Sequence, residues 1–381
     1  MFLDKLISSA SPLIWVLSGL MVLSFIVQMI YFLAVYLRIL TYKTPKKKKK
    51  ERIGISVVIC ARNEAENLAK NLPLFLEQDY PEYEIVVVND CSTDNTEEVL
   101  MNLKVKYARL HYTTIHPDRK FTHGKKLALT VGIKAAKYDH LLLSDADCYP
   151  VSDQWIKTLS RHFSKTTELI LGVSKFERKK GILNIIIRFE MLFSTMQYMA
   201  FAINGNAFRG VGRNLAYKKE LFFRHKGFAS HLKVIAGDDD LFVSEAATRS
   251  NTAIELSKKS FMISEAPSSL GEWLKQKKRR LSTVKFYKTS SKIRFETEYL
   301  SRILYYISAI YLLFYDHWFW IALGALFVLS FTKLVVVKLT MKRLDERDLL
   351  LPSLLLDPLM PLILGLIRIS NLIRPREPKW N

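Results

Sequence analysis

The stretch Leu141-Leu142-Leu143-Ser144-Asp145-Ala146-Asp147 decides how this chain is interpreted. Its apolar beginning predicts a buried β-strand, and two carboxylates follow two residues apart. In an extended segment residues i and i+2 project to the same side, so we expect Asp145 and Asp147 to face one ion or one ligand together. Two such residues also occur in ordinary solvated turns, so the meaning of the pair depends on the rest of the chain.

Strands alternate with helices around this segment. Short apolar runs at 55–60 and 84–88 predict two more strands, and polar residues with capping spacing follow each run. This alternation predicts an α/β domain with a mostly parallel central sheet. The expected capping pairs are Asn63 with Glu66 and Asp94 with Glu97, and helices are expected through Leu100 and over 125–137 and 155–163.

Chemically useful side chains gather at the ends of the predicted strands. Ligands of parallel α/β sheets bind beyond the carboxyl ends of the strands, at the point where the strand order reverses. The residues at these ends are Asn63, Glu64, Asp90, Asp145 and Asp147, together with the cysteines Cys60, Cys91 and Cys148. No C-x-x-C spacing indicates a metal site, so we expect three free thiols near one pocket, or three small buried residues without a role.

An apolar segment near the N-terminus predicts a membrane anchor over 1–44. No charged side chain occurs from Leu13 to Leu37, which is long enough for one helix to cross a bilayer. A signal peptide would be shorter and would end in a small-residue cleavage site, whereas Lys46–Lys50 follows here. Because lysines beyond a span mark the cytoplasmic side, we expect the α/β domain, 51–270, in the cytosol.

Apolar segments return after this domain. The segment 182–208 is interrupted by polar residues, which predicts a helix lying on the membrane or against the next element. The region 271–298 predicts a basic amphipathic helix at the membrane surface, and 299–338 a transmembrane hairpin. Prolines and Asp357 interrupt 349–367, which favours an interfacial or membrane-inserted segment over 349–381 rather than another crossing.

The net charge of +21 does not indicate a nucleic-acid partner. No compact nucleic-acid-binding motif accompanies it. The basic clusters at 46–50, at 275–280 and near the C-terminus all lie beside apolar stretches. Attraction to anionic lipid headgroups explains this placement better, so the partner expected from the charge is the membrane.

A run of three carboxylates, Asp238-Asp239-Asp240, follows Gly237. Unpaired charges are costly in a core, so a solvated loop would explain the run if it stood alone. Beside a metal site it indicates a general base whose pKa is set by like-charged neighbours.

The motifs, in their order, resemble those of the inverting family 2 glycosyltransferases, which have the nucleotide-sugar-binding GT-A fold. The resemblance extends from Ile55 to about Thr283, and the flanking spans resemble those of the membrane-embedded members. It is carried by SVVICARNEAENL, EIVVVNDCSTDNT, HGKKLAL, LLLSDADC, GVGRNLAYKKELF, GDDDLF and QKKRR.

This resemblance implies roles for individual residues. It implies that Asp145 contacts the ribose or diphosphate, and that Asp147, together with Asp145, holds a divalent metal. Magnesium or manganese suits a site of oxygen ligands and phosphate. It also implies that Asp90 contacts the base of the nucleotide, and that Lys125, Asn63 and Glu64 contact the nucleotide-sugar. The implied catalytic base is Asp239 or, as second choice, Asp238. Gln276 and Arg279 match the polar positions of the family's Q-x-x-R-W motif.

The implied reaction is a single displacement with inversion at the sugar, from a nucleotide-sugar that we expect to be a UDP-sugar. The tryptophan of the Q-x-x-R-W motif is replaced by Arg280, which removes the aromatic platform of processive synthases. We therefore expect transfer of one sugar to a lipid or membrane-proximal glycan acceptor, by a multi-pass protein of the cell membrane. The alternatives are a processive polysaccharide synthase and a non-catalytic membrane scaffold that retains the fold.

Overall fold

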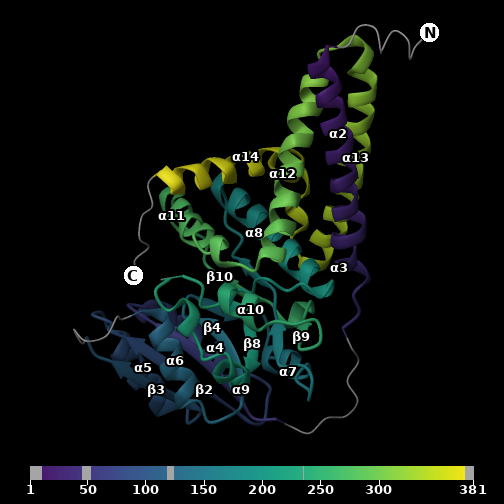
Figure 1. The fold of residues 1–381 in the computed structure, drawn as a ribbon. Coiled ribbons are helices and arrows are strands. Elements are labelled where there is room, and N and C mark those ends of the chain that lie inside the picture. The colour runs from purple at the N-terminus through teal and green to yellow at the C-terminus, as the bar shows by residue number, and fades with distance from the viewer. Residues whose placement is uncertain (1–10, 45–52, 118–123, 235, 374–381) are drawn as a thin grey trace. The chain divides into compact units, whose positions relative to one another are not determined.

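The computed structural model describes residues 11–44, 53–117, 124–234 and 236–373. The chain divides into two compact units, which we describe separately (Figure 1). One consists of Met1–Tyr42 and Thr289–Ile373, and the other of Lys43–Lys288 with Arg374–Asn381. The predicted basic cluster Lys46–Lys50 and the C-terminal basic tail beyond residue 373 lie outside the described residues.

The second unit contains a seven-stranded sheet with the order β3-β2-β1-β4-β8-β6-β9. β8 pairs antiparallel with β4 and β6, whereas all other neighbours are parallel, so the predicted mostly parallel sheet is confirmed. A smaller sheet has the order β5-β10-β7. The strands are β1 Ile55–Ala61, β2 Tyr83–Asp90, β3 Leu110–Ile115, β4 His140–Asp145, β5 Cys148–Pro150, β6 Leu169–Leu171, β7 Ser174–Phe176, β8 Leu215–Lys218, β9 Thr252–Ile254 and β10 Met262–Ser264.

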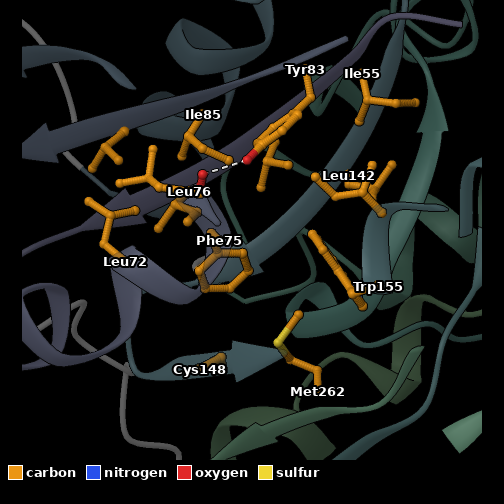
Figure 2. Close-up of a cluster of buried hydrophobic side chains, with 14 of the residues drawn as sticks. Ile55, Leu72, Phe75, Leu76, Tyr83, Ile85, Leu142, Cys148, Trp155 and Met262 are labelled. Carbon is orange, nitrogen blue, oxygen red and sulfur yellow. Dashed lines mark hydrogen bonds between the residues drawn. The ribbon is translucent and has the colours of Figure 1, made fainter. Parts of the chain in front are cut away.

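The main sheet is buried because helices cover it. Every residue of β1 and β2 is buried, which explains why their sequences are nearly continuous apolar runs rather than alternating patterns. In the core beneath the sheet, the rings of Phe75 and Trp155 meet edge to face with centroids 5.5 Å apart (Figure 2). The Tyr83 hydroxyl donates to the carbonyl of Leu76 at 2.6 Å, which fixes the end of α4. The helices of this unit are α4 Ala65–Leu76, α5 Thr96–Lys106, α6 Lys125–Ala135, α7 Trp155–Ser160, α8 Ile182–Ile203, α9 Lys219–Arg224, α10 Asp240–Ala246 and α11 Leu270–Leu281.

Asp94 of the loop after β2 caps both its own helix, as predicted, and α4, whereas the predicted cap from Asn63 is wrong. Asn63 has a positive φ of 54° and does not cap α4; its side chain accepts from the backbone N–H of Thr93 at 2.8 Å. The Asp94 carboxylate accepts from the backbone N–H groups of Ala65 and Thr96, both at 3.1 Å. Because β1 and β2 are parallel neighbours, their ends meet, and the cap of α4 comes from the adjacent loop.

The segment that carries Asp145 and Asp147 is not extended throughout. β4 ends at Asp145, and Asp147 lies in the turn before β5. The expected alternation of side chains along one strand therefore does not bring the two carboxylates together. The turn does this instead, by reversing the chain between strands of two different sheets.

α8 and α11 belong to the second unit and pack within it. α8 is buried along most of its length and contacts β7 and β9. Of the two predicted environments, the membrane surface and a neighbouring element, the structure shows the second. Trp273 and Lys277 of α11 are also buried, and Lys277 forms an ion pair with Glu190 of α8. The expectation that the basic face of α11 lies wholly on lipid headgroups is wrong for Lys277, because the buried Glu190 carboxylate holds it inside the protein.

The first unit is helical, and α2, α12 and α13 lie side by side (Figure 1). By length and composition, three segments of the described chain are able to cross a membrane: Pro12–Thr41, Asp316–Leu344 and Arg347–Asn371. The expectation that prolines break the last segment is wrong, because Pro358 and Pro361 lie inside one helix. The elements are α2 Pro12–Ile30, which continues through η1 Tyr31–Tyr36 to α3 Arg38–Thr41, and α12 Thr289–Leu312, α13 Asp316–Leu344 and α14 Leu350–Ile373.

Candidate active site

A cavity of about 230 Å³ opens at the carboxyl ends of β1 and β4. These strands flank the point where the strand order reverses, because β2 follows on one side of β1 and β4 lies on the other. The charged and polar side chains that line the cavity are those of Arg62, Glu64, Lys125, Asp145, Asp147, Arg209, Arg213, Asp238, Asp239, Asp240, Gln276, Arg279, Arg280 and Thr283.

Asp145, Asp147 and Cys148 form a compact group at this edge of the sheet. One ligand atom of each lies within 4.8 Å of the other two. Burial raises the pKa of the Cys148 thiol well above its usual value, so the thiol keeps its proton and donates to Asp147 at 3.0 Å. Burial and the neighbouring Asp145 raise the pKa of Asp147. A cation placed between the two carboxylates would relieve their repulsion.

The donor set at this position fits a hard divalent cation. Magnesium and manganese prefer carboxylate oxygens, and Asp145 and Asp147 supply them on the cavity wall. A protonated thiol is a poor ligand for such ions, so Cys148 fixes the Asp147 carboxylate instead of binding metal. The residues present therefore suit the metal that the sequence predicts.

Lys125, the first residue of α6, connects this group to the acidic triplet. Its ammonium lies 2.7 Å from an oxygen of Asp145 and 3.0 Å from an oxygen of Asp238. Burial disfavours the charged form, but the carboxylates outweigh it and hold the pKa of Lys125 well above its usual value. The end of β4 and the loop before α10 are thus joined by one fixed positive charge.

The three consecutive carboxylates have different surroundings. Asp238 pairs with Lys125, and burial raises its pKa. Asp239 caps α10, since its oxygens accept from the backbone N–H groups of Gly212 at 2.8 Å and Asp240 at 2.7 Å. Burial opposes ionisation of Asp239, but Lys125 and the Gly212 N–H hold its pKa below the ordinary value.

The third carboxylate, Asp240, is buried and is engaged by two hydroxyl groups. It accepts hydrogen bonds from the hydroxyl groups of Thr283 and Tyr287, and burial raises its pKa to about 6. The preceding Gly237 has a φ of 93°, and a Cβ there would lie 2.5 Å from a side-chain carbon of Leu241. The turn that separates the three carboxylates therefore requires glycine.

The opposite wall of the cavity is basic. α11 contributes Gln276, Arg279 and Arg280, and the segment before β8 contributes Arg209 and Arg213. Arg213 is held by a hydrogen bond to the Ser264 hydroxyl, and its guanidinium lies 4.6 Å from the ring centre of Phe176. The arginines are presented from fixed backbone, because α11 is anchored by the Lys277–Glu190 ion pair.

Most residues predicted for the site meet in this cavity. Asp90 does not line it; this residue is buried at the end of β2, where it accepts from the Cys91 thiol at 3.5 Å. Asn63 lies in an adjoining depression that shares Glu64 with the cavity. Cys60 lines the cavity and Cys148 touches Asp147, so two of the three cysteines lie at the pocket. The predicted residues that line the cavity are Glu64, Lys125, Asp145, Asp147, Asp238, Asp239, Gln276 and Arg279.

The sequence prediction assigned no site role to Arg62 or Arg209, whereas it expected the segment 210–214, which contains Arg213, to help form the donor pocket. Arg62 follows β1 directly, so the strand-end argument that selected Asn63 and Glu64 would also have selected Arg62. Arg209 has no comparable signal, because it reaches the cavity from an irregular segment more than sixty residues after β4. Arg213 lines the cavity, as expected for the segment 210–214. Arg280 was noted only as a departure from the motif, and the structure places it on the cavity wall.

Residues 56–224 match the sequence profile of the family described as Glycosyl transferase family 2. Two curated relatives are poly-beta-1,6-N-acetyl-D-glucosamine synthases. That of Staphylococcus epidermidis (strain ATCC 35984) is 31% identical over 147 residues, which are 38% of this chain and 34% of the relative. That of Staphylococcus aureus (strain COL) is 34% identical over 105 residues, which are 28% and 24% of the two chains. The matches thus span about a third or less of these relatives' length.

A solved structure with a similar fold is the mannosyltransferase PcManGT from Pyrobaculum calidifontis, in complex with GDP-Man and Mn²⁺. It aligns with a TM-score of 0.59 at 17% identity, over 91% of this chain and 98% of the other. The shared architecture is that of the predicted GT-A fold.

Proposed function

We propose, from the premise that residues 56–224 form a glycosyl transferase family 2 domain, that this chain is a membrane-bound glycosyltransferase. The observation that carries the proposal is the convergence of Lys125 with Asp145, Asp147 and Asp238 on one cavity at the sheet's switch point. The reaction is an inverting displacement in which an acceptor hydroxyl attacks the sugar and a nucleoside diphosphate leaves.

The donor is a nucleotide-sugar, and both carboxylates and arginines of the cavity contribute to binding it. Asp147 and Asp145 would hold a magnesium or manganese ion, which when bound neutralises charge on the diphosphate. Arg213 and Arg279 add fixed positive charge for the same phosphates. We expect a UDP-sugar; the similar fold of PcManGT, solved with GDP-Man, makes GDP-sugars the first alternative to assay. The roles of Asn63, Glu64 and Asp90 toward the nucleotide remain predictions.

The catalytic base is one of the first two carboxylates of the triplet. A general base must be ionised in order to accept the proton of the acceptor hydroxyl, and it accepts this proton more readily when its pKa is raised toward the working pH. Asp238 has a raised pKa, whereas the two oxygens of Asp239 already accept backbone hydrogen bonds that lower its pKa. Although the motif made Asp239 the first choice, these surroundings favour Asp238 as the base and give Asp239 the task of shaping the loop.

The acceptor is a lipid or a membrane-proximal glycan, and one sugar is transferred in each reaction. Arg280 supports single transfer, because it occupies the cavity wall where the motif of processive enzymes has tryptophan. A processive polysaccharide synthase is the second candidate, and the names of the curated relatives favour it. A scaffold without activity is disfavoured, because a full set of carboxylates lines the cavity.

The helical unit attaches the enzyme to the membrane. Three helices long and apolar enough to span it support a multi-pass protein. We propose that the α/β unit faces the cytoplasm, where nucleotide-sugars are made. Cysteine labelling from each side of sealed vesicles tests this orientation.

The decisive experiment is a donor screen on the detergent-solubilised full chain, with Mn²⁺ or with chelator, that measures released nucleoside diphosphate. We expect release from one donor class, and its loss with chelator. No metal-dependent release from any donor would contradict the proposed function, and a ladder of products would establish the processive candidate.

Two matched variants identify the base in the same assay. Asp238→Asn is expected to lower kcat by about 10²–10⁴-fold with unchanged nucleotide affinity. Asp239→Asn is expected to lower kcat less and to reduce thermal stability, since it weakens the cap of α10. The reverse ranking of the two kcat values would assign the base to Asp239.

A further inference from the structure

Two arginines of the cavity wall, Arg209 and Arg280, have no partner within the described part of the chain. The Arg209 residue is only 9% exposed, and its Nη2 is buried without a hydrogen bond among the described residues. The guanidinium of Arg280 also makes neither a hydrogen bond nor an ion pair with the described residues. Burial, followed by the charge of Arg209, lowers the pKa of Arg280 to about 10.

The carboxylates nearest to Arg209 are already engaged by other groups. Glu190 pairs with Lys277, and Asp240 accepts from the hydroxyls of Thr283 and Tyr287. Asp239 accepts from two backbone N–H groups. Burial disfavours the charge of Arg209, but Tyr287 and these carboxylates hold its pKa above the ordinary value, although none of them forms an ion pair with it among the described residues. A buried guanidinium without a close counter-ion is costly, and a ligand that supplies an anion removes this cost.

The positions of these arginines separate them from the donor's phosphates. Lys125 and Arg213 are the cations near Asp145 and Asp147, where the diphosphate is proposed to lie. The charges that act on Arg209 are those of Tyr287, Asp240, Glu190 and Asp239. Asp239 of the carboxylate triplet acts on both Arg209 and Arg280, although Arg280 also interacts with Arg213. The triplet is where the acceptor hydroxyl must approach its base.

We propose that Arg209 and Arg280 bind an anionic group of the acceptor, a phosphate or a carboxylate. This inference rests on the proposed function and specifies its substrate class as an anionic acceptor. The planar guanidinium groups suit both anions, because each offers two parallel N–H donors to two oxygens. The bound anion holds the neighbouring acceptor hydroxyl beside the carboxylates that deprotonate it.

The test uses acceptor pairs that differ by one charge, with the purified full chain in detergent. Polyprenyl phosphate is compared with polyprenol, and a glucuronosyl lipid with the matching glucosyl lipid, so that the two arms distinguish phosphate from carboxylate. For one pair we expect kcat/KM at least about 10-fold higher for the charged member. Arg209→Gln should remove this preference, Arg209→Lys should restore part of it, and neither should change the Kd of nucleoside diphosphate more than about 2-fold.

Arg279→Gln is the matched control, because Arg279 lines the same cavity from the same helix as Arg280. It should weaken nucleotide binding and leave the charge preference intact. Equal kcat/KM for both members of both pairs would overturn the proposal, as would a rise in nucleotide Kd in Arg209→Gln equal to that in Arg279→Gln.

A binding arm without donor separates this proposal from the proposed function. Wild-type protein should bind one charged lipid at least about 10-fold more tightly than its neutral partner, and Arg209→Gln should not. Equal binding of charged and neutral lipids in both pairs refutes the anion site. If the charged lipid binds selectively but no donor releases nucleoside diphosphate, the anion site stands and the proposed activity fails.

Discussion

The chain contains two clusters of buried ionisable side chains, and their pairing differs. In the helical unit, Lys333 of α13 lies 3.0 Å from Asp357 of α14, and Arg302 of α12 contacts both Asp357 and Glu298. The Tyr306 hydroxyl also donates to Asp357 at 2.7 Å. Each charge in this cluster has an opposite charge within it. In the cavity of the α/β unit, Arg209 and Arg280 form no ion pair among the described residues, although Glu190 and Asp239 act on both.

This difference separates a structural cluster from a binding site. Charged residues among membrane helices are often functional, yet this group links three helices and leaves no described charge without a counter-ion. The cavity contains unpaired cations beside crowded carboxylates, which a ligand and a metal would complete. Unpaired charge, rather than charge alone, therefore indicates where a ligand binds.

The largest effect is expected when one carboxylate of each cluster is replaced and the two variants are compared. Asp147→Asn should lower kcat by about 10²–10³-fold, because one of the two carboxylates proposed to bind the metal is lost. Asp357→Asn, in the helical unit, should keep kcat within about 3-fold. Released nucleoside diphosphate at saturating donor and Mn²⁺ measures both. Similar losses in the two variants would remove the distinction between the clusters.

The loss of stability should differ in size between the two regions. Lys333→Met leaves Asp357 with a weaker set of partners and should destabilise the helical unit by about 3–5 kcal/mol. Arg209→Gln removes a buried charge that forms no ion pair and should lower the thermal midpoint much less than Lys333→Met does. Thermal unfolding in detergent compares them. A large loss of stability in Arg209→Gln would show that Arg209 supports the fold.

A moderate effect is expected from Lys126, which follows Lys125 in the sequence but faces another loop. Its ammonium donates to the carbonyls of His231 at 2.7 Å and Val234 at 2.6 Å, just before the acidic triplet. Lys126→Met should lower kcat about 10-fold through misplaced carboxylates, with little change in nucleotide Kd. Lys134→Met, on the exposed side of α6, is the control. Equal kcat values for wild type and Lys126→Met would refute the positioning role.

The smallest effect concerns pH. Burial raises the pKa of Glu64 from 4.5 to about 7. The folded state then binds more protons than the unfolded state between these values, so stability is highest below about pH 4.5 and falls as the pH rises toward 7. Glu64→Gln should lack this component, which we expect to be below about 1 kcal/mol because the carboxyl is partly exposed.

Thermal midpoints from pH 4.5 to 8, measured with chelator, test this expectation. The thermal midpoint of the wild type should fall relative to that of Glu64→Gln as the pH rises. A difference that does not depend on pH would show that Glu64 titrates normally. Asp357→Asn provides the comparison with the paired cluster.

Much of the fold was predictable because the strands of the main sheet are short apolar runs with polar residues at their ends. Lys125, Asp145 and Asp147 were found from that pattern and from motif resemblance. The cap of α4 was not, because Asn63 and Asp94 bond across adjacent loops that are about thirty residues apart in sequence. The burial of Lys277 was also missed, since its partner Glu190 lies on another helix.

The sequence by itself determined the alternation of strands and helices, the apolar segments and the acidic motifs, because these depend on local periodicity and spacing. Only the tertiary structure decided which carboxylates are engaged and which arginines are not. Pairing depends on distances between side chains far apart in the chain, and burial sets how strongly each charge needs a partner. For that reason Asp145 and Asp147 could be selected from the sequence, while Arg209 and Arg280 emerged as a pair only in the folded protein.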